Sequence, residues 1–227
     1  MASTPLVISI EGNIGSGKST LLRELRQRNP AWHFVDEPVD SWMSMKNDAG
    51  ESLLSLFYAD KRRWAYTFQN TALLTRILAL RSAIEDWVHA GRPGRPIFVT
   101  ERCIQTDAKV FATMLHDEGV MDGLEWTLYT NWFAAFSDQV PRPAGYLYVD
   151  TPPAVCAERI VGRHRAGEGG GAIPLEYLRE LDAAHTEWLG TGSARAPVLF
   201  VDNSSKDVTP IESVEQWVER QWLGSVD

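Results

Sequence analysis

The chain has 227 residues, 44% hydrophobic and 23% charged, which predicts one globular domain over residues 1–227. Its 22 basic and 30 acidic residues give a net charge of −8, which argues against nucleic acid or an anionic membrane as partner. The two cysteines are too few for a disulfide framework, and the five histidines show no metal-ligand spacing. Because no apolar run is long enough for a membrane span and no signal peptide precedes the first apolar stretch, we expect a cytoplasmic protein.

A phosphate-binding loop lies near the start of the chain. Residues 12–19, G-N-I-G-S-G-K-S, fit the G-x-x-x-x-G-K-[ST] pattern without a mismatch. An apolar strand at 6–10 precedes the loop and a helical pattern at 19–25 follows it, which a chance glycine-rich turn would not explain. Glycines let backbone N–H groups close around phosphate oxygens, and the helix N-terminus adds positive potential. We therefore expect a nucleoside triphosphate here, bound by Gly12, Asn13, Ile14, Gly15, Ser16, Gly17, Lys18, Ser19 and Thr20.

Strand and helix patterns then alternate to the end of the chain. Further strands are expected at 32–35, 97–100, 146–149 and 198–201. Helices are expected at 51–60, 62–89, 106–117, 122–139, 154–163, 175–189 and 209–222, the last opened by a capping box at 209–212. The alternation predicts an α/β fold with a five-stranded parallel sheet that has helices on both faces.

Charged residues follow two of the expected strands. Glu37 comes after the strand at 32–35, and Glu101 and Arg102 come after the strand at 97–100. The carboxyl ends of parallel strands face the ligand crevice of an open α/β sheet, so we expect these side chains near bound substrate. Judged by residue type alone, Glu37 could instead be a surface glutamate, and Glu101 and Arg102 could form a surface ion pair.

Six motifs occur in order: I-E-G-N-I-G-S-G-K-S-T, D-E-P-V-D-S-W, R-W-A-Y-T-F-Q, E-R-C, E-W-T-L-Y and I-P-L-E-Y-L. With them the chain resembles the deoxyribonucleoside kinases, most of all the deoxycytidine and deoxyguanosine kinases, from about Val7 to Asp202. The resemblance implies a P-loop kinase fold and transfer of the γ-phosphate of ATP, with Mg²⁺, to the 5′-hydroxyl of a deoxyribonucleoside in nucleotide salvage. It also implies a homodimer, whose interface the apolar helices at 62–89 and 122–139 could form, although a buried core would leave the same pattern.

The resemblance assigns roles to the charged residues. Glu37 is similar to the catalytic carboxylate that accepts the proton of the 5′-hydroxyl, and Arg102 to the residue that bridges this carboxylate and the reacting phosphate. Glu101 would hold Mg²⁺ with Ser19, and Lys18 would bind the terminal phosphates. Cys103 stands where the family usually has serine, and because a thiol donates hydrogen bonds poorly, we interpret it as a packing substitution rather than a redox switch.

A lid over the triphosphate is implied at about 159–173. Its catalytic and phosphate-binding arginines would be Arg159, Arg163 and Arg165, on the spacing R-x-x-x-R-x-R. Such a lid neutralises phosphate oxygens in the transition state, whereas without the phosphate loop a solvated basic helix face would be the better interpretation. Glu168 corresponds to the lid glutamate that binds the 3′-hydroxyl with Tyr58, an assignment left open because this lid is longer than that of deoxycytidine kinases.

The resemblance also implies contacts to the base of the nucleoside and to the adenine of the phosphate donor. Gln69 would pair with the edge of the nucleoside base, and the aromatic residues around it would be Trp42, Phe57, Phe68 and Phe111, with Phe111 stacked on the base. Taken singly, each aromatic residue is more often part of a core than a ligand contact. Asp202 and Asn203 resemble the loop that contacts the adenine of the phosphate donor.

Arg76 and Asp107 bear on the choice of nucleoside. They match the pair that deoxycytidine and deoxyguanosine kinases place against the base, where thymidine-preferring relatives have smaller or apolar residues. A buried charged pair is costly unless polar groups meet it, so a base with an amino group or a purine N7 is expected and thymidine should be poor. The ranking of deoxycytidine, deoxyadenosine and deoxyguanosine stays open. Alternatives are a thymidylate-type nucleoside monophosphate kinase and a catalytically silent relative with a structural role.

Overall fold

A parallel sheet forms the centre of the fold. The computed structural model describes residues 4–163, 173–205 and 211–224. All strand pairs are parallel, and the order across the sheet is β2-β3-β1-β4-β5. The strands are β1 (Leu6–Glu11), β2 (His33–Val35), β3 (Ile97–Glu101), β4 (Gly145–Asp150) and β5 (Val198–Asp202). The five-stranded parallel sheet expected from the sequence is therefore confirmed.

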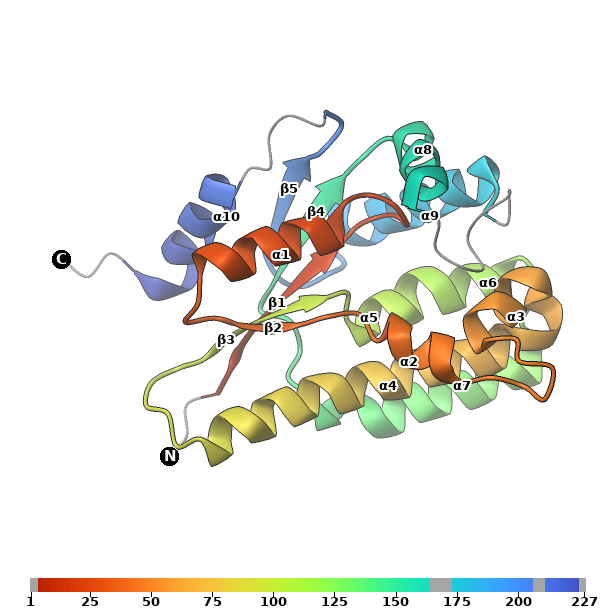
Figure 1. The fold of residues 1–227 in the computed structure, drawn as a ribbon, viewed down its shortest axis with the longest axis horizontal. Coiled ribbons are helices and arrows are strands. Elements are labelled where there is room, and N and C mark those ends of the chain that lie inside the picture. The colour runs from red at the N-terminus through yellow and green to blue at the C-terminus, as the bar shows by residue number, and fades with distance from the viewer. Residues whose placement is uncertain (1–3, 164–172, 206–210, 225–227) are drawn as a thin grey trace.

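Helices cover both faces of this sheet (Figure 1). Successive strand residues point to opposite faces, so Leu6, Ile8 and Ile10 pack with helices α1 (Lys18–Arg28) and α10 (Ile211–Val218). Val7 of β1 belongs instead to the core on the other face, which contains the residues of α4 and α7. Helices α8 (Pro153–Arg163) and α9 (Leu175–Gly190) form a third core cluster with Tyr146 and Tyr148 of β4.

The face opposite α1 is built around one long helix. Helix α4 (Lys61–His89) has 29 residues and begins at Asp60, whose side chain accepts a hydrogen bond from the backbone of Arg63. Helix α7 (Gly123–Phe136) begins with the capping box of Asp122 and Glu125 and lies along α4 (Figure 1). The short helices on this side are α2 (Val39–Ser44), α3 (Leu53–Ala59), α5 (Ile104–Thr106), α6 (Thr113–Asp117) and the 3₁₀ segment η2 (Ser137–Gln139).

Three features differ from the expectation. Helix α2 was not expected, and the single helix expected at 106–117 is divided by a π-helical segment, η1 (Asp107–Ala112), between α5 and α6. The last helix passes into a second π-helical segment, η3 (Glu219–Leu223). The glycine-rich residues 167–171 and the start of the capping box at 209–210 lie outside the described residues. Within the described ranges, no helix is both long enough and apolar enough to cross a membrane.

Candidate active site

A cavity of about 390 Å³ opens at the carboxyl ends of β1, β2 and β3. Its volume is in the range of small-molecule sites. One side is formed by the phosphate loop and the start of α1, and the other by aromatic residues of α2, α3, α4 and η1. Of the residues expected in the site, it is lined by Ile14, Gly15, Gly17, Lys18, Ser19, Thr20, Glu37, Trp42, Phe57, Tyr58, Phe68, Gln69, Arg76, Glu101, Arg102, Asp107, Phe111 and Arg159.

Gly12, Gly15 and Gly17 of the phosphate loop have positive φ, a backbone conformation that residues with a side chain rarely adopt. Gly12 has a φ of 140°, and a Cβ there would lie 2.7 Å from the carbonyl oxygen of Val149. Gly17 has a φ of 102° and begins α1. The Lys18 Nζ donates to the carbonyl oxygen of Asn13 at 2.7 Å. Gly12, Asn13 and Ser16 are buried and shape the loop without lining the cavity.

Ser19 and Glu101 meet beside the phosphate loop. The Ser19 Oγ donates to the Glu101 carboxylate at 2.9 Å. Burial and the neighbouring negative charge of Glu37 raise the pKa of Glu101. A hydroxyl and a carboxylate oxygen at one edge of a phosphate site are the ligand types that Mg²⁺ takes together with substrate phosphates. These two residues therefore fit the metal expected from the sequence.

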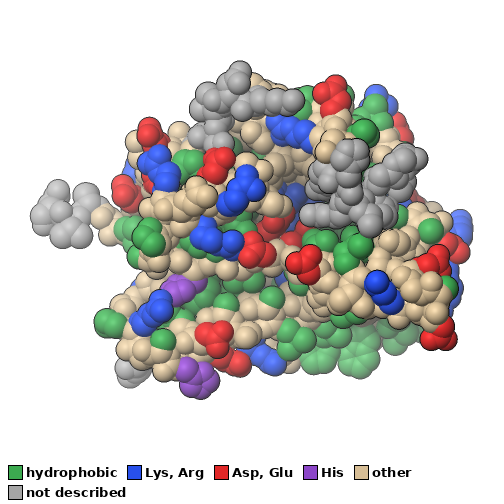
Figure 2. Space-filling model, viewed as in Figure 1, with side chains coloured by type: hydrophobic (Ala, Val, Ile, Leu, Met, Phe, Trp, Pro, Cys, Tyr) green, Lys and Arg blue, Asp and Glu red, His purple; other side chains and the backbone are tan. Residues whose placement is uncertain are grey.

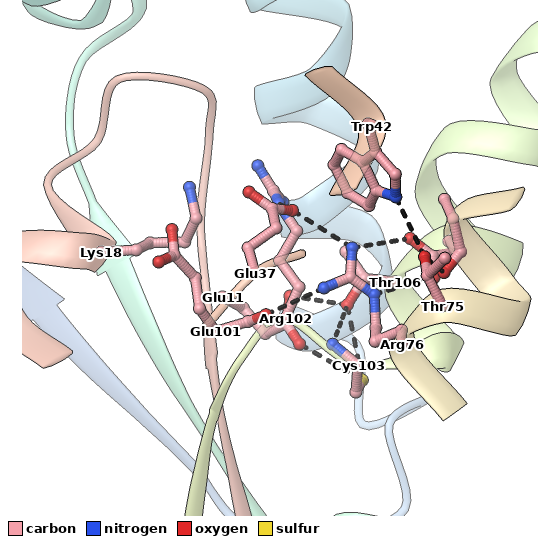
Figure 3. A network of polar contacts seen from close by, with 12 residues as sticks. Glu11, Lys18, Glu37, Trp42, Thr75, Arg76, Glu101, Arg102, Cys103 and Thr106 are labelled. Carbon is pink, nitrogen blue, oxygen red and sulfur yellow. Dashed lines mark hydrogen bonds and ion pairs between the residues drawn. The ribbon is translucent and has the colours of Figure 1, made fainter. Parts of the chain in front are cut away.

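Glu37 is held by two guanidinium groups (Figure 3). Its Oε1 lies 3.2 Å from Nε of Arg102 and 3.1 Å from a terminal nitrogen of Arg76. Burial alone would raise the pKa of Glu37, but the charges of Arg102, Arg76 and Lys18 lower it to about 2. The carboxylate is thus ionised at neutral pH and lies between the phosphate loop and the aromatic side of the cavity.

Arg76 and Asp107 form a bidentate pair across the cavity wall. The Nε of Arg76 lies 2.9 Å from one oxygen of Asp107, and a terminal nitrogen lies 3.2 Å from the other. Arg76 also donates to Glu37 and, at 2.9 Å, to the backbone carbonyl of Glu101. We expected a substrate base to meet this buried pair, and the structure shows that the protein itself supplies several of its partners. Arg76 therefore connects the base side of the cavity to Glu37.

The aromatic side of the cavity contains one unsatisfied amide. Phe57 and Phe68 stack with their ring centroids 4.5 Å apart, and Trp42 meets Phe68 edge-on at 5.2 Å. Trp42 is oriented by a 2.9 Å hydrogen bond from its indole to Thr75. The Oε1 of Gln69 is buried and accepts no hydrogen bond from the residues that the structure describes. A buried acceptor of this kind is costly unless a ligand donates to it.

The chain is similar to known proteins over nearly its whole length. The sequence model of the family described as "Deoxynucleoside kinase" matches residues 8–226. This chain belongs to the deoxynucleoside kinase family. The kinase is 36% identical to "Deoxycytidine kinase 2" of Gallus gallus over 218 residues, 86% of this chain and 81% of the other.

Two further relatives cover similar shares. "Deoxycytidine kinase" of Homo sapiens is 35% identical over 199 residues, 80% of this chain and 74% of the other. "Deoxyguanosine kinase, mitochondrial" of Xenopus laevis is 31% identical over 195 residues, 80% of this chain and 72% of the other. The kinase is thus an ATP-binding transferase that moves a phosphoryl group from a nucleotide donor.

The expected lid and adenine-binding residues are only partly placed in this kinase. Arg159 donates to the backbone carbonyls of Ser16 and Asn203, at 3.2 Å and 3.0 Å, so it is bound to the phosphate loop. The Asn203 amide also donates to the Ser16 carbonyl, and Asp202 is exposed at the end of β5. The side chain of Arg163 and residues Arg165 and Glu168 lie outside the described part of the chain.

Sequence reasoning missed Glu11, at the end of β1. Its buried carboxylate accepts from Ser9 at 2.5 Å, Thr106 at 2.6 Å and Cys103 at 3.3 Å (Figure 3). Cys103 is therefore more than a packing residue, because its thiol reaches a carboxylate. Burial and the charge of Glu11 raise the pKa of this thiol well above its usual value, which opposes a reactive thiolate. The available signal was a glutamate closing a buried strand directly before Gly12.

Proposed function

We propose that this kinase transfers the γ-phosphate of ATP to the 5′-hydroxyl of a deoxyribonucleoside, as the first step of nucleotide salvage. The observation that carries the proposal is the ionised Glu37, held by Arg102 between the phosphate loop and the aromatic cavity. The favoured substrates are deoxycytidine, deoxyadenosine and deoxyguanosine rather than thymidine. The names of the relatives, deoxycytidine and deoxyguanosine kinases, support two of these three substrates.

Phosphoryl transfer needs no covalent intermediate with the protein, so catalysis depends on positioning and on electrostatic stabilisation. The transition state is loose, so orientation of the hydroxyl and stabilisation of charge matter more than a strong base. Glu37 accepts a hydrogen bond from the 5′-hydroxyl and aligns its oxygen with the γ-phosphorus. As the new O–P bond forms, Glu37 takes the hydroxyl proton, the bond from the γ-phosphorus to the β,γ-bridging oxygen breaks, and ADP leaves. Arg102 keeps Glu37 in place and, with Lys18, stabilises the charge on the phosphate oxygens.

Ser19 and Glu101 would hold Mg²⁺, which neutralises phosphate charge when it is bound. The arginines of the lid at about 159–173, Arg159, Arg163 and Arg165, close the triphosphate side. On the sugar side, Tyr58 binds the 3′-hydroxyl together with a glutamate of the lid, for which Glu168 is the candidate. Asp202 and Asn203 contact the adenine of the donor.

The base specificity depends on the far wall of the cavity. The free acceptor of Gln69 takes a hydrogen bond from the amino group of cytosine or adenine, or from an N–H of guanine. Arg76 and Asp107 occupy the volume that the thymine methyl group would need. Because both side chains are buried and already paired with each other, displacing them is costly.

An initial-rate panel tests the proposal. Purified protein is supplied with Mg-ATP and, in turn, the four natural deoxyribonucleosides and thymidine monophosphate. We expect turnover of the three amino-bearing nucleosides and little of thymidine. If thymidine were the best substrate, the roles assigned to Arg76 and Asp107 would be wrong, but the proposed kinase reaction would stand. Activity confined to the monophosphate would favour the thymidylate-type kinase, and no activity at all would favour a structural role.

We also propose that two copies pair through α4 and α7. Hydrophobic side chains gather along the lower right edge of the molecule in Figure 2, over these helices. Among the exposed ones are Leu74, Leu78, Leu124, Leu128 and Trp132. An apolar surface of this kind favours a protein partner, and the homodimer implied by the family makes a second copy the expected one.

Sedimentation of wild type and a double variant tests the pairing. We expect wild type at twice the mass of one chain, and Leu128→Glu with Trp132→Glu at the mass of one chain, because burying carboxylates in an apolar interface is costly. The matched control is Leu223→Glu, an equally exposed leucine in η3 that should leave the mass unchanged. A wild-type protein that sediments as one chain at micromolar concentration would refute the pairing.

A further inference from the structure

His185 of α9 lies directly behind the cavity. Its side chain is fully buried, and its Nε2 lies 3.3 Å from a terminal nitrogen of Arg102. Its Nδ1 lies 2.6 Å from the carbonyl oxygen of Leu181, one turn earlier in the same helix. A carbonyl only accepts, so Nδ1 carries the proton and Nε2 presents its lone pair. An arginine only donates, so the two contacts agree on one tautomer.

The ring stays neutral in this position. Burial, together with the positive charge of Arg102, lowers the pKa of His185 to about 3. A charged imidazole would repel the guanidinium and would have no acceptor to offer it. The neutral ring instead gives Arg102 a fixed acceptor on the side away from Glu37.

Arg102 is restrained on several sides. Its Nε faces Glu37 at 3.2 Å, and its guanidinium lies over the ring of Phe111, 4.9 Å from the centroid. Phe111 in turn meets His185 edge-on at 6.3 Å. The Arg102 backbone has a φ of 61°, which is uncommon outside glycine, and its N–H donates to the Ile10 carbonyl at 2.9 Å. Such strained backbone persists only where surrounding contacts determine it.

We propose that His185 is a positioning residue for phosphoryl transfer, whose neutral imidazole fixes the Arg102 guanidinium in the orientation that holds Glu37. This inference rests on the proposed function. An arginine side chain loses much rotamer freedom when it is held in one geometry, and His185 provides that restraint before substrate binds. The same helix holds the phosphate loop, because the Leu178 carbonyl accepts from the Asn13 amide at 2.7 Å. Helix α9 therefore contacts both the phosphate loop and Arg102, and it aligns the phosphate side of the reacting centre with the carboxylate of Glu37.

Steady-state kinetics of two variants test the role of His185. His185→Phe keeps a ring but has no acceptor, whereas His185→Gln carries an amide oxygen that reaches the position of Nε2. We expect the Phe variant to lower kcat by about 10-fold to 100-fold with the nucleoside KM within about twofold, as for a misplaced catalytic group. The Gln variant should retain kcat within about threefold of wild type. The matched control is His116→Phe, a half-buried histidine stacked on Trp126, which should behave as wild type.

Thermal unfolding by circular dichroism accompanies the kinetics. If the Phe variant does not fold, His185→Asn replaces it, because asparagine keeps a donor for Leu181 but its side chain is too short to reach Arg102. We expect the same loss of kcat from it. Equal kcat values for the Gln variant and the variant without an acceptor would overturn the inference, whether both are active or both are impaired. An inactive wild-type enzyme would overturn the proposed function and this inference with it.

Discussion

Replacing Glu37 by Gln should lower kcat by about 10²-fold or more while the nucleoside Kd stays nearly unchanged. The amide oxygen of Gln can still accept a hydrogen bond from Arg102 or Arg76, so the cavity keeps its shape. What is lost is the negative charge that orients the 5′-hydroxyl and accepts its proton. Isothermal titration of deoxycytidine gives the Kd, and initial rates at saturating nucleoside give kcat.

The neighbour Asp36 provides the matched control for Glu37. Asp36 is exposed and pairs with Arg26 at 2.7 Å on the surface, so Asp36→Asn should leave kcat unchanged. The neighbouring cations lower the pKa of Glu37 in the folded protein to about 2. The ionised carboxylate therefore stabilises the fold at pH values above the pKa that Glu37 has in the unfolded chain, and this stabilisation is lost as pH falls toward 2. Glu37→Gln should therefore unfold at a lower Tm than wild type at pH 7. An unchanged kcat would remove Glu37 from the mechanism.

Replacing Arg76 by Met together with Asp107 by Ala should raise the ratio of thymidine to deoxycytidine kcat/KM by about tenfold or more. The double change removes a charged pair and opens space for the thymine methyl group. Arg76→Met alone would leave the buried Asp107 carboxylate without its guanidinium partner and destabilise the fold. Because Arg76 also contacts Glu37, absolute rates should fall for every nucleoside, and the ratio is the informative quantity.

An exposed arginine–aspartate pair serves as the control for the Arg76 and Asp107 double variant. Arg26→Met with Asp36→Ala removes an ion pair in which both side chains are well exposed, and it should leave the ranking of nucleosides unchanged. The measurement is the full set of kcat/KM values for the four nucleosides with each protein. A ranking that is the same in the Arg76 and Asp107 double variant as in wild type would show that this pair does not face the base.

The sequence by itself determined the sheet and the phosphate loop. Buried parallel strands consist of nearly continuous apolar residues, so the five strands were predicted close to their observed bounds. The loop at residues 12–19 carries its own signature, because glycines are required where φ is positive. The order of charged residues after the strands also predicted that Glu37, Glu101 and Arg102 would share one edge of the sheet. Helix α2 was missed because a six-residue helix has too few turns for periodicity to show.

Only the tertiary structure decided which buried polar groups are partners. Arg76 reaches Glu37 from 39 positions away, and His185 reaches Arg102 from 83 positions away. Periodicity shows which face of an element is buried, but it contains no information on which donor meets which acceptor inside the core. The π-helical segment that carries Asp107 was also hidden, since its residue types suit an ordinary α-helix. Such pairings depend on the packing of whole elements, because each buried charge takes its partner from whatever the fold brings within hydrogen-bond distance.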